Sequence, residues 1–212
     1  MPERTAIKAP WWKRFEDLAI ALPALVILAP VVGLIALAVR LEDRGPIFFS
    51  DERVGAGGAS FRMLKFRTMT EGAIDQGRGR LVAARDERIT RIGNLLRRLS
   101  LDELPQIFNV LRGDMSVVGP RPTFAEQVRR YTPRHRDRLR AKPGITGLAQ
   151  VNGRNDLSWA ERIALDLEYI EHMSPLLDLA ILVRTPFVVL SGRGLYGRKG
   201  VTPDYESGAD QP

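Results

Sequence analysis

Two adjacent acids, Asp102 and Glu103, are the residues whose types and spacing best suit chemistry. They follow Ser100 in the sequence Ser-Leu-Asp-Glu, which matches a capping box, so we expect a helix to begin at Ser100 with both acids in its first turn. The positive end of a helix favours ionised carboxylates. The pair could supply a nucleophile or metal ligands, whereas Glu103 could instead act only as the capping partner of Ser100.

Other common chemistries lack their residues in this sequence. The chain has no cysteine, which excludes disulfides, thiolate zinc sites and a cysteine nucleophile and fits a reducing compartment. Its two histidines, His135 and His172, are too few and too scattered for a metal cluster. Neither a P-loop nor a strand-linked GxGxxG motif occurs. Because the lack of cysteine fits a reducing compartment, the cytoplasmic side is the expected location.

The chain carries a formal net charge of +7 over 212 residues, enough for one compact domain and a modest appendage. Such a surface attracts nucleic acid, anionic lipid headgroups or phosphorylated substrates, and charge alone does not choose among them. Most of the basic residues are arginine, whose planar fork binds phosphate through two bonds.

An uncharged, almost wholly apolar run over residues 18–39 is the strongest organisational signal. As a helix it would reach ~33 Å, enough for a hydrocarbon layer of ~30 Å. It is longer than a usual signal-peptide core. Pro23 and Pro30 disfavour a straight helix, and basic residues flank the run on both sides, so the positive-inside rule indicates no clear crossing. A spanning helix and one that dips in and returns both remain open.

The remaining sequence predicts short strands and amphipathic helices. Alternating apolar residues around the turn at 55–58 indicate a β-hairpin, and the polar stretch 70–80 a mobile loop. Helices are expected from Ile92 to Leu99, from Ser100 to Gly113, and from a second capping box at Ser158 toward Met173. The stretch 176–190 suits a helix in the membrane interface or, alternatively, a buried core helix.

Five motifs, in a fixed order over most of residues 45–190, resemble the signature of the monotopic phosphoglycosyl transferases. They are SLDELPQ at 100–106, NVLRGDMS at 109–116, VGPRP at 118–122, KFRTM at 65–69 and KPGITGLAQVNGR at 142–154. The resemblance implies that Asp102 attacks the sugar-proximal phosphate of a UDP-sugar, releasing UMP, and that polyprenyl phosphate then collects the phosphosugar. It implies Mg²⁺ as the cofactor, with Asp102 and Glu103 as its ligands. The phosphate- and substrate-binding residues within or beside the motifs are expected to be Lys65, Arg67, Arg97, Arg121, Gln150 and Arg154.

The resemblance also implies a fold class, a division of the chain into segments and a location in the cell. The expected fold is α+β, mainly α, with a small β-hairpin and amphipathic interfacial helices. Residues 1–44 form a re-entrant anchor bent near Ala29 and Pro30, residues 45–201 the catalytic domain including the interfacial helix 176–190, and residues 202–212 a disordered tail. The protein is expected on the cytoplasmic face of the bacterial inner membrane, in contact with membrane lipids and not with nucleic acid. Whether it forms a homodimer stays open.

Two other functions compete with this interpretation. A basic protein that binds membrane surfaces or nucleic acid would need neither a metal nor an acid pair. A hydrolase of lipid-linked diphosphates would use the same acids to hold a metal that activates water. The sugar itself cannot be read from these residues.

Overall fold

The computed structural model describes residues 9–75, 82–83 and 86–197. Part of the expected loop at 70–80 and all of the expected tail at 202–212 lie outside these residues. Within them the helices are α1 (Trp11–Asp43), α2 (Arg91–Arg98), α3 (Gln106–Arg112), α4 (Ala125–Arg129), α5 (Leu148–Asn152), α6 (Trp159–His172) and α7 (Pro175–Ser191), and the strands are β1 (Phe48–Val54), β2 (Ser60–Phe66), β3 (Ser116–Val118) and β4 (Gly144–Thr146).

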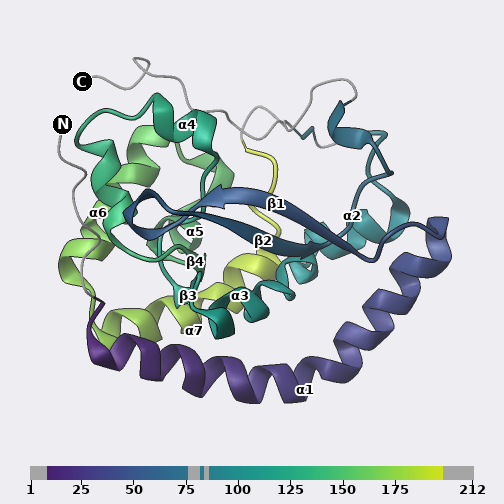
Figure 1. Cartoon of the computed structure of the whole chain (residues 1–212), viewed down its shortest axis with the longest axis horizontal. Coiled ribbons are helices and arrows are strands. Elements are labelled where there is room, and N and C mark those ends of the chain that lie inside the picture. Colours follow the sequence, from purple (N-terminus) through teal and green to yellow (C-terminus); the bar gives the residue numbers. More distant parts are fainter. Residues whose placement is uncertain (1–8, 76–81, 84–85, 198–212) are drawn as a thin grey trace.

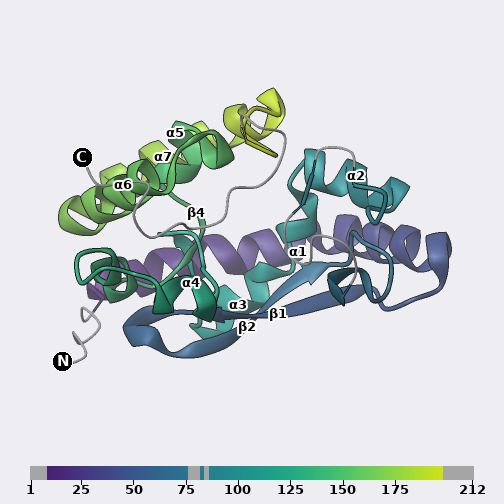
Figure 2. The ribbon, with the colours of Figure 1, turned by 90° about the horizontal axis from the view of Figure 1, so that it is seen from above.

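Helices dominate, and the expected α+β, mainly α, class is confirmed. Figure 1 shows the antiparallel hairpin of β1 and β2 crossing the molecule while α1 runs beneath it. Seen from above, α5, α6 and α7 lie on one side of α1, and the hairpin lies on the other (Figure 2). Strands β3 and β4 pair in parallel as a second, two-stranded sheet.

The predicted hairpin is confirmed, and one buried amide fixes it to the rest of the domain. Its register runs from Phe48 opposite Phe66 to Val54 opposite Ser60. The fully buried Asn109 of α3 accepts a hydrogen bond from the backbone of Leu64 at 3.0 Å and donates one to the carbonyl of Arg62 at 2.7 Å. These two bonds hold strand β2 against α3, so Lys65 comes to lie near the acids that precede α3.

The main core lies where α1, the hairpin and the C-terminal helices meet. It is built from apolar side chains of α1, β2, α3, β3, α5, α6 and α7 and of the segments between them, including Ala21, Met63, Val110, Met115, Val118, Tyr169 and Ile181. The predicted helix from Ile92 is present as α2, and Thr90 caps it by accepting a bond from the backbone of Gly93. The second predicted capping box is also confirmed, because Ser158 and Glu161 bond each other's backbone at the start of α6.

Helix α1 is continuous through both of its prolines. A break was expected near Ala29 and Pro30, but the helix is not interrupted there. Instead it curves, as Figure 1 shows, with its C-terminal end rising toward α2. Interior prolines remove backbone bonds and bend a helix that neighbouring contacts keep intact. The described anchor is therefore one curved helix and not the two helices separated by a break that were expected.

Both ends of α1 are fixed to the same domain. Near its start, Lys13 forms a buried ion pair with Asp178 of α7, and Arg14 donates to two carbonyls at the end of α3. Near its end, Ile35 and Val39 enter a second apolar cluster, and the Glu42 carboxylate accepts a bond from the first turn of α2. Between them, most of the apolar side chains point away from the protein.

Asp17 is the buried acid that fastens α1 to the second sheet. One of its oxygens accepts bonds from the Ser116 hydroxyl at 2.7 Å and the Val117 backbone at 2.8 Å, and the residue is 1% exposed.

We expect Asp17→Ala to lower the free energy of unfolding by about 2–4 kcal/mol, because both buried donors lose a charged acceptor. Urea unfolding of the detergent-solubilised protein measures this. The exposed acid Glu171 supplies the control, since Glu171→Ala should change stability by less than ~0.5 kcal/mol; equal effects of the two changes would contradict the role of Asp17.

Candidate active site

Asp102 and Glu103 lie in a short 3₁₀ turn, Leu101–Glu103, and not in the first turn of an α-helix. The predicted capping box at Ser100 is wrong. Ser100 has a φ of 54°, and its side chain makes no capping bond. Pro105 explains the difference, because proline lacks the N–H and crowds the carbonyl four residues earlier, so an α-helix cannot run from Leu101 through it. Helix α3 begins only at Gln106 and ends, as predicted, at Gly113.

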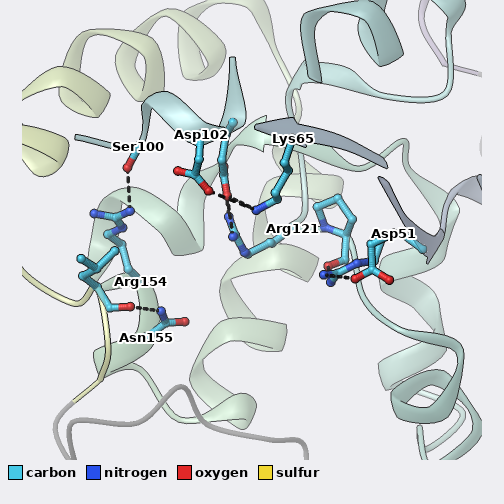
Figure 3. Close-up of polar contacts among 11 residues, drawn as sticks. Asp51, Lys65, Ser100, Asp102, Arg121, Arg154 and Asn155 are labelled. Atoms are coloured by element: carbon cyan, nitrogen blue, oxygen red, sulfur yellow. Dashed lines mark hydrogen bonds and ion pairs between the residues drawn. The ribbon is translucent and has the colours of Figure 1, made fainter. Parts of the chain in front are cut away.

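Two cations hold Glu103 and leave the neighbouring acid unbonded. Lys65 lies 2.7 Å and Arg121 2.8 Å from the same Glu103 oxygen. Asp102 is 3.9 Å from the Lys65 ammonium and 8% exposed, and among the described residues its carboxylate accepts no hydrogen bond. Figure 3 shows the three side chains of Lys65, Asp102 and Arg121 converging on this point. The two acids therefore have different surroundings although they are adjacent.

The electrostatics of the pair follow from these contacts. Burial, together with the charge of Glu103, raises the pKa of Asp102, while Lys65 opposes the shift. Burial acts on Glu103 in the same direction, but the charges of Arg121 and Lys65 outweigh it and hold the pKa of Glu103 well below its usual range. Glu103 is a fixed negative charge. Burial makes the ionised form of Asp102 unfavourable, so a reaction or a bound cation that neutralises this charge is favoured here.

A polar cavity of about 520 Å³ opens beside the pair. Lys65, Arg97, Arg121, Gln150 and Arg154, all predicted from sequence, line it together with both acids. Arg154 donates to the Ser100 hydroxyl at 2.9 Å, as Figure 3 shows. One guanidinium nitrogen each of Arg97 and Arg154, and both amide atoms of Gln150, are buried without a hydrogen-bond partner among the described residues. Buried donors normally have partners, so this cavity is built for a polar, anionic ligand.

An apolar groove of about 310 Å³ reaches the same place from the side of α1 and α7. Ile20, Ala24 and Leu28 of α1 and Val188 and Val189 of α7 line its outer part. Its inner end shares five residues with the polar cavity, which are Ser100, Glu103, Arg121, Gln150 and Arg154. The site thus offers one polar and one apolar approach to the acid pair.

Arg67 is the one predicted phosphate-binding residue that the structure does not bring to this cavity. Its guanidinium pairs with the Asp43 carboxylate at the end of α1 and donates to the Pro46 carbonyl. These contacts tie the anchor to the hairpin, and Arg67 lowers the pKa of Asp43 by hydrogen bonding.

The cavity residues that the sequence analysis missed include Arg162 of α6, and Tyr196, which follows α7. A sequence signal existed for the first, because Trp159, Arg162 and Asp166 recur at helical spacing on one face of α6. No local pattern indicates Tyr196. It reaches the cavity because Asn155 donates from its backbone to the Gly194 carbonyl and from its side chain to the Leu195 carbonyl.

The donor set fits Mg²⁺ only as an ion shared with a substrate. Among the described residues, no group of three or more His, Asp or Glu side chains is placed to hold a metal. Glu103 is already bonded to two cations, while the Asp102 oxygens are available. Protein-bound Mg²⁺ commonly takes one or two carboxylates, several waters and substrate phosphates. A diphosphate substrate would complete such a site.

The fold and the site combine a long apolar helix with a cavity lined by an acid pair and several cations, and the comparisons give the family. The model of the bacterial sugar transferase family matches residues 8–192. The chain belongs to this family, so the resemblance to phosphoglycosyl transferases is confirmed, and it is an enzyme of that type.

Named relatives cover nearly the whole chain. The exopolysaccharide production protein ExoY of Sinorhizobium fredii is 41% identical over 198 residues, which span 87% of this chain and 88% of that protein. The uncharacterized sugar transferase EpsL of Bacillus subtilis is 40% identical over 93% and 96% of the two chains. A UDP-glucose:undecaprenyl-phosphate glucose-1-phosphate transferase of Caulobacter vibrioides is 45% identical over 82% of this chain and 67% of its own.

The different surroundings of Arg67 and Arg97 predict opposite effects of the same change. Arg67→Gln should lower the free energy of unfolding by about 1–3 kcal/mol, because it breaks the bonds to Asp43 and Pro46. It should leave the thermal stabilisation by added inorganic diphosphate intact. Arg97→Gln should fold normally and lose most of that stabilisation. Thermal unfolding with and without diphosphate measures both, and a loss of diphosphate stabilisation in Arg67→Gln would place Arg67 in the binding site after all.

Proposed function

We propose that this enzyme moves a sugar phosphate from a UDP-sugar to polyprenyl phosphate, releases UMP and passes through a phosphosugar bound to Asp102. The observation that carries the proposal is one buried carboxylate without hydrogen bonds, in a cationic cavity that shares five residues, Glu103 among them, with an apolar groove. The polar cavity suits the nucleotide-sugar donor, and the apolar groove suits the lipid acceptor. The relatives named as undecaprenyl-phosphate glucose transferases support the substrate classes.

In the first step an Asp102 oxygen attacks the sugar-proximal phosphorus. A bond forms from that oxygen to phosphorus, and the bond from phosphorus to the oxygen bridging to the nucleotide breaks, so UMP leaves with the bonding electrons. Lys65, Arg97 and Arg121 are the cations that would orient the diphosphate and stabilise the charge that develops on it. The ion pairs of Glu103 with Lys65 and Arg121 keep two of these cations in place.

In the second step a phosphate oxygen of the polyprenyl phosphate attacks the same phosphorus and displaces Asp102. The products are the lipid-linked diphosphate sugar and the free carboxylate. An aspartyl phosphate hydrolyses readily, so it needs surroundings that exclude water. The apolar groove, which the lipid would fill, supports this requirement.

Mg²⁺ is the cofactor that we propose, held by Asp102 with the substrate diphosphate and with Glu103 close by. When bound, it offsets the repulsion between the carboxylate and the diphosphate.

The enzyme is proposed to sit on the cytoplasmic face of the bacterial inner membrane through α1 and α7. The described chain contains one helix long and apolar enough to cross a membrane, which is α1. Its large apolar side chains are widely exposed, Val26 at 74% and Ile27 at 70%, and so are Phe187 at 71% and Leu190 at 76% on α7. Exposed apolar surface of this extent marks a membrane contact. Since both ends of α1 bind the same domain, we propose that it enters and leaves one leaflet.

Asp102→Asn tests the proposed function most directly. We expect it to lower the rate of lipid-linked sugar formation by at least ~10³-fold, because an amide oxygen is a very weak nucleophile. The rate is measured as UMP release from a panel of UDP-sugars with Mg²⁺ and undecaprenyl phosphate, which also identifies the sugar. Intact-protein mass spectrometry of the wild-type enzyme, mixed with the UDP-sugar alone, should find one phosphosugar on Asp102.

A matched control separates chemistry from folding. Asp156→Asn changes the charge equally on a residue outside the cavity and should keep wild-type turnover. An Asp102→Asn enzyme that still builds the lipid-linked sugar overturns the proposal. A product without lipid, formed by hydrolysis, would favour the diphosphate hydrolase instead.

The anchor topology can be tested because the chain has no native cysteine. Single cysteines at the exposed positions Ala9 and Arg44 flank the two ends of α1. A membrane-impermeant thiol reagent should label neither in intact spheroplasts and both after lysis, because both ends lie on the cytoplasmic side. Labelling of Ala9→Cys alone in intact spheroplasts would show that α1 spans the bilayer.

A further inference from the structure

Arg162 is a half-buried cation that lines the active-site cavity and has no ion pair with either acid of the catalytic pair among the described residues. It lies on α6, with its guanidinium 5.2 Å from the centre of the Trp159 ring, and it donates to the Leu157 carbonyl at 3.3 Å. Its Nε is buried and has no hydrogen-bond partner among the described residues. Buried donors normally have hydrogen-bond partners, and Arg162 lines the cavity, where a ligand could interact with its guanidinium.

The acid nearest to Arg162 is already occupied. Asp166, one turn further along α6, forms a buried ion pair with Arg138, which also donates to the Tyr131 hydroxyl at 2.6 Å. Burial and the positive charges of Arg121 and Arg138 lower the pKa of Arg162 to about 10. This end of the cavity therefore holds more positive than negative charge, and an anion would relieve the imbalance.

The place of Arg162 in the same cavity as Asp102 indicates which anion it would bind. Arg121 contacts Glu103, and its positive charge also acts on Arg162. Both arginines line the cavity that holds the acid pair. A diphosphate attacked by Asp102 at one phosphorus would place its second phosphate among the other cations of this cavity, which include Arg162.

We propose that Arg162 binds the nucleotide-side phosphate of the donor and stabilises it as it leaves with UMP. The inference rests on the proposed function, since it assigns this residue to the first half of that reaction. When Asp102 bonds to the sugar-proximal phosphorus, the bridging oxygen departs with the electron pair, and negative charge grows on the departing phosphate. A fixed guanidinium at this place stabilises that charge more in the transition state than in the bound substrate.

The lipid acceptor should not use Arg162. The apolar groove reaches the acid pair through Ser100, Glu103, Arg121, Gln150 and Arg154, and Arg162 does not line it. In a two-step transfer with a covalent intermediate, kcat/KM for each substrate reports only its own half-reaction. Measuring kcat/KM for each substrate therefore distinguishes a phosphate-binding role of Arg162 from a general structural role.

The test compares Arg162→Gln with Arg136→Gln, the same change at an exposed arginine outside the cavity. Arg162→Gln should lower kcat/KM for the UDP-sugar about 10- to 100-fold, as expected for loss of a charge-assisted bond. The value for polyprenyl phosphate should stay within about 2-fold of wild type. The inhibition constant of UMP should rise in parallel while that of uridine, which lacks the phosphate, stays unchanged. Arg162→Lys, which keeps the charge, should recover part of the loss.

Three results would overturn the inference. Arg162→Gln could match Arg136→Gln, it could slow both half-reactions equally, or it could weaken uridine as much as UMP. Failure of the proposed function looks different, because then the wild-type enzyme itself would form no lipid-linked sugar or Asp102→Asn would remain active. Calorimetric titration of UMP into Asp102→Asn protein, with and without Arg162→Gln, measures the phosphate contact without turnover.

Discussion

Two carboxylates on consecutive residues cannot share a buried site unless something compensates their charge, and the rest of the active site depends on how this is done. Lys65 and Arg121 both bind Glu103, so one acid is permanently ionised and occupied. The other, Asp102, is buried, accepts no hydrogen bond among the described residues and lies 3.9 Å from the Lys65 ammonium. The arrangement assigns different roles to the two acids: Glu103 organises cations, and Asp102 is available to react. Without the hairpin that carries Lys65, this division would be lost.

The anchor depends on the same principle of compensated burial. The Lys13 and Asp178 ion pair and the Asp17 bonds to the second sheet fix the start of α1, and the Arg67 and Asp43 pair fixes its end. A long apolar helix held at both ends by one domain must expose its middle on one side of that domain. The same helix lines the apolar groove, so in the proposed function the placement of the membrane and the supply of the lipid acceptor would both depend on α1.

Local signals in the sequence predicted local structure well. The hairpin, α2, the Ser158 capping box and the Gly113 helix end all rest on patterns within a few residues, and all are confirmed. The Ser100 capping box failed because Pro105 decides the turn, a signal that was present in the sequence. The contacts of Arg67 join residues far apart in the chain. The contacts of Arg162 are local, but its place in the cavity depends on packing between elements, and no periodicity encodes which arginine lines a cavity.

The shared inner end of the two cavities bears on why a covalent intermediate suits this site. In a direct transfer, the attacking lipid oxygen and the leaving nucleotide oxygen must lie on opposite sides of phosphorus, which requires two separate cationic surfaces. In the proposed mechanism Asp102 is on one side of phosphorus in both steps, so the nucleotide would leave from, and the lipid would arrive at, the same opposite side. One set of donors, including Arg121, Gln150 and Arg154, would then serve both substrates in turn. A residue beyond that set, such as Arg162, can act on the donor alone, so selectivity between the two half-reactions follows from position in one cavity.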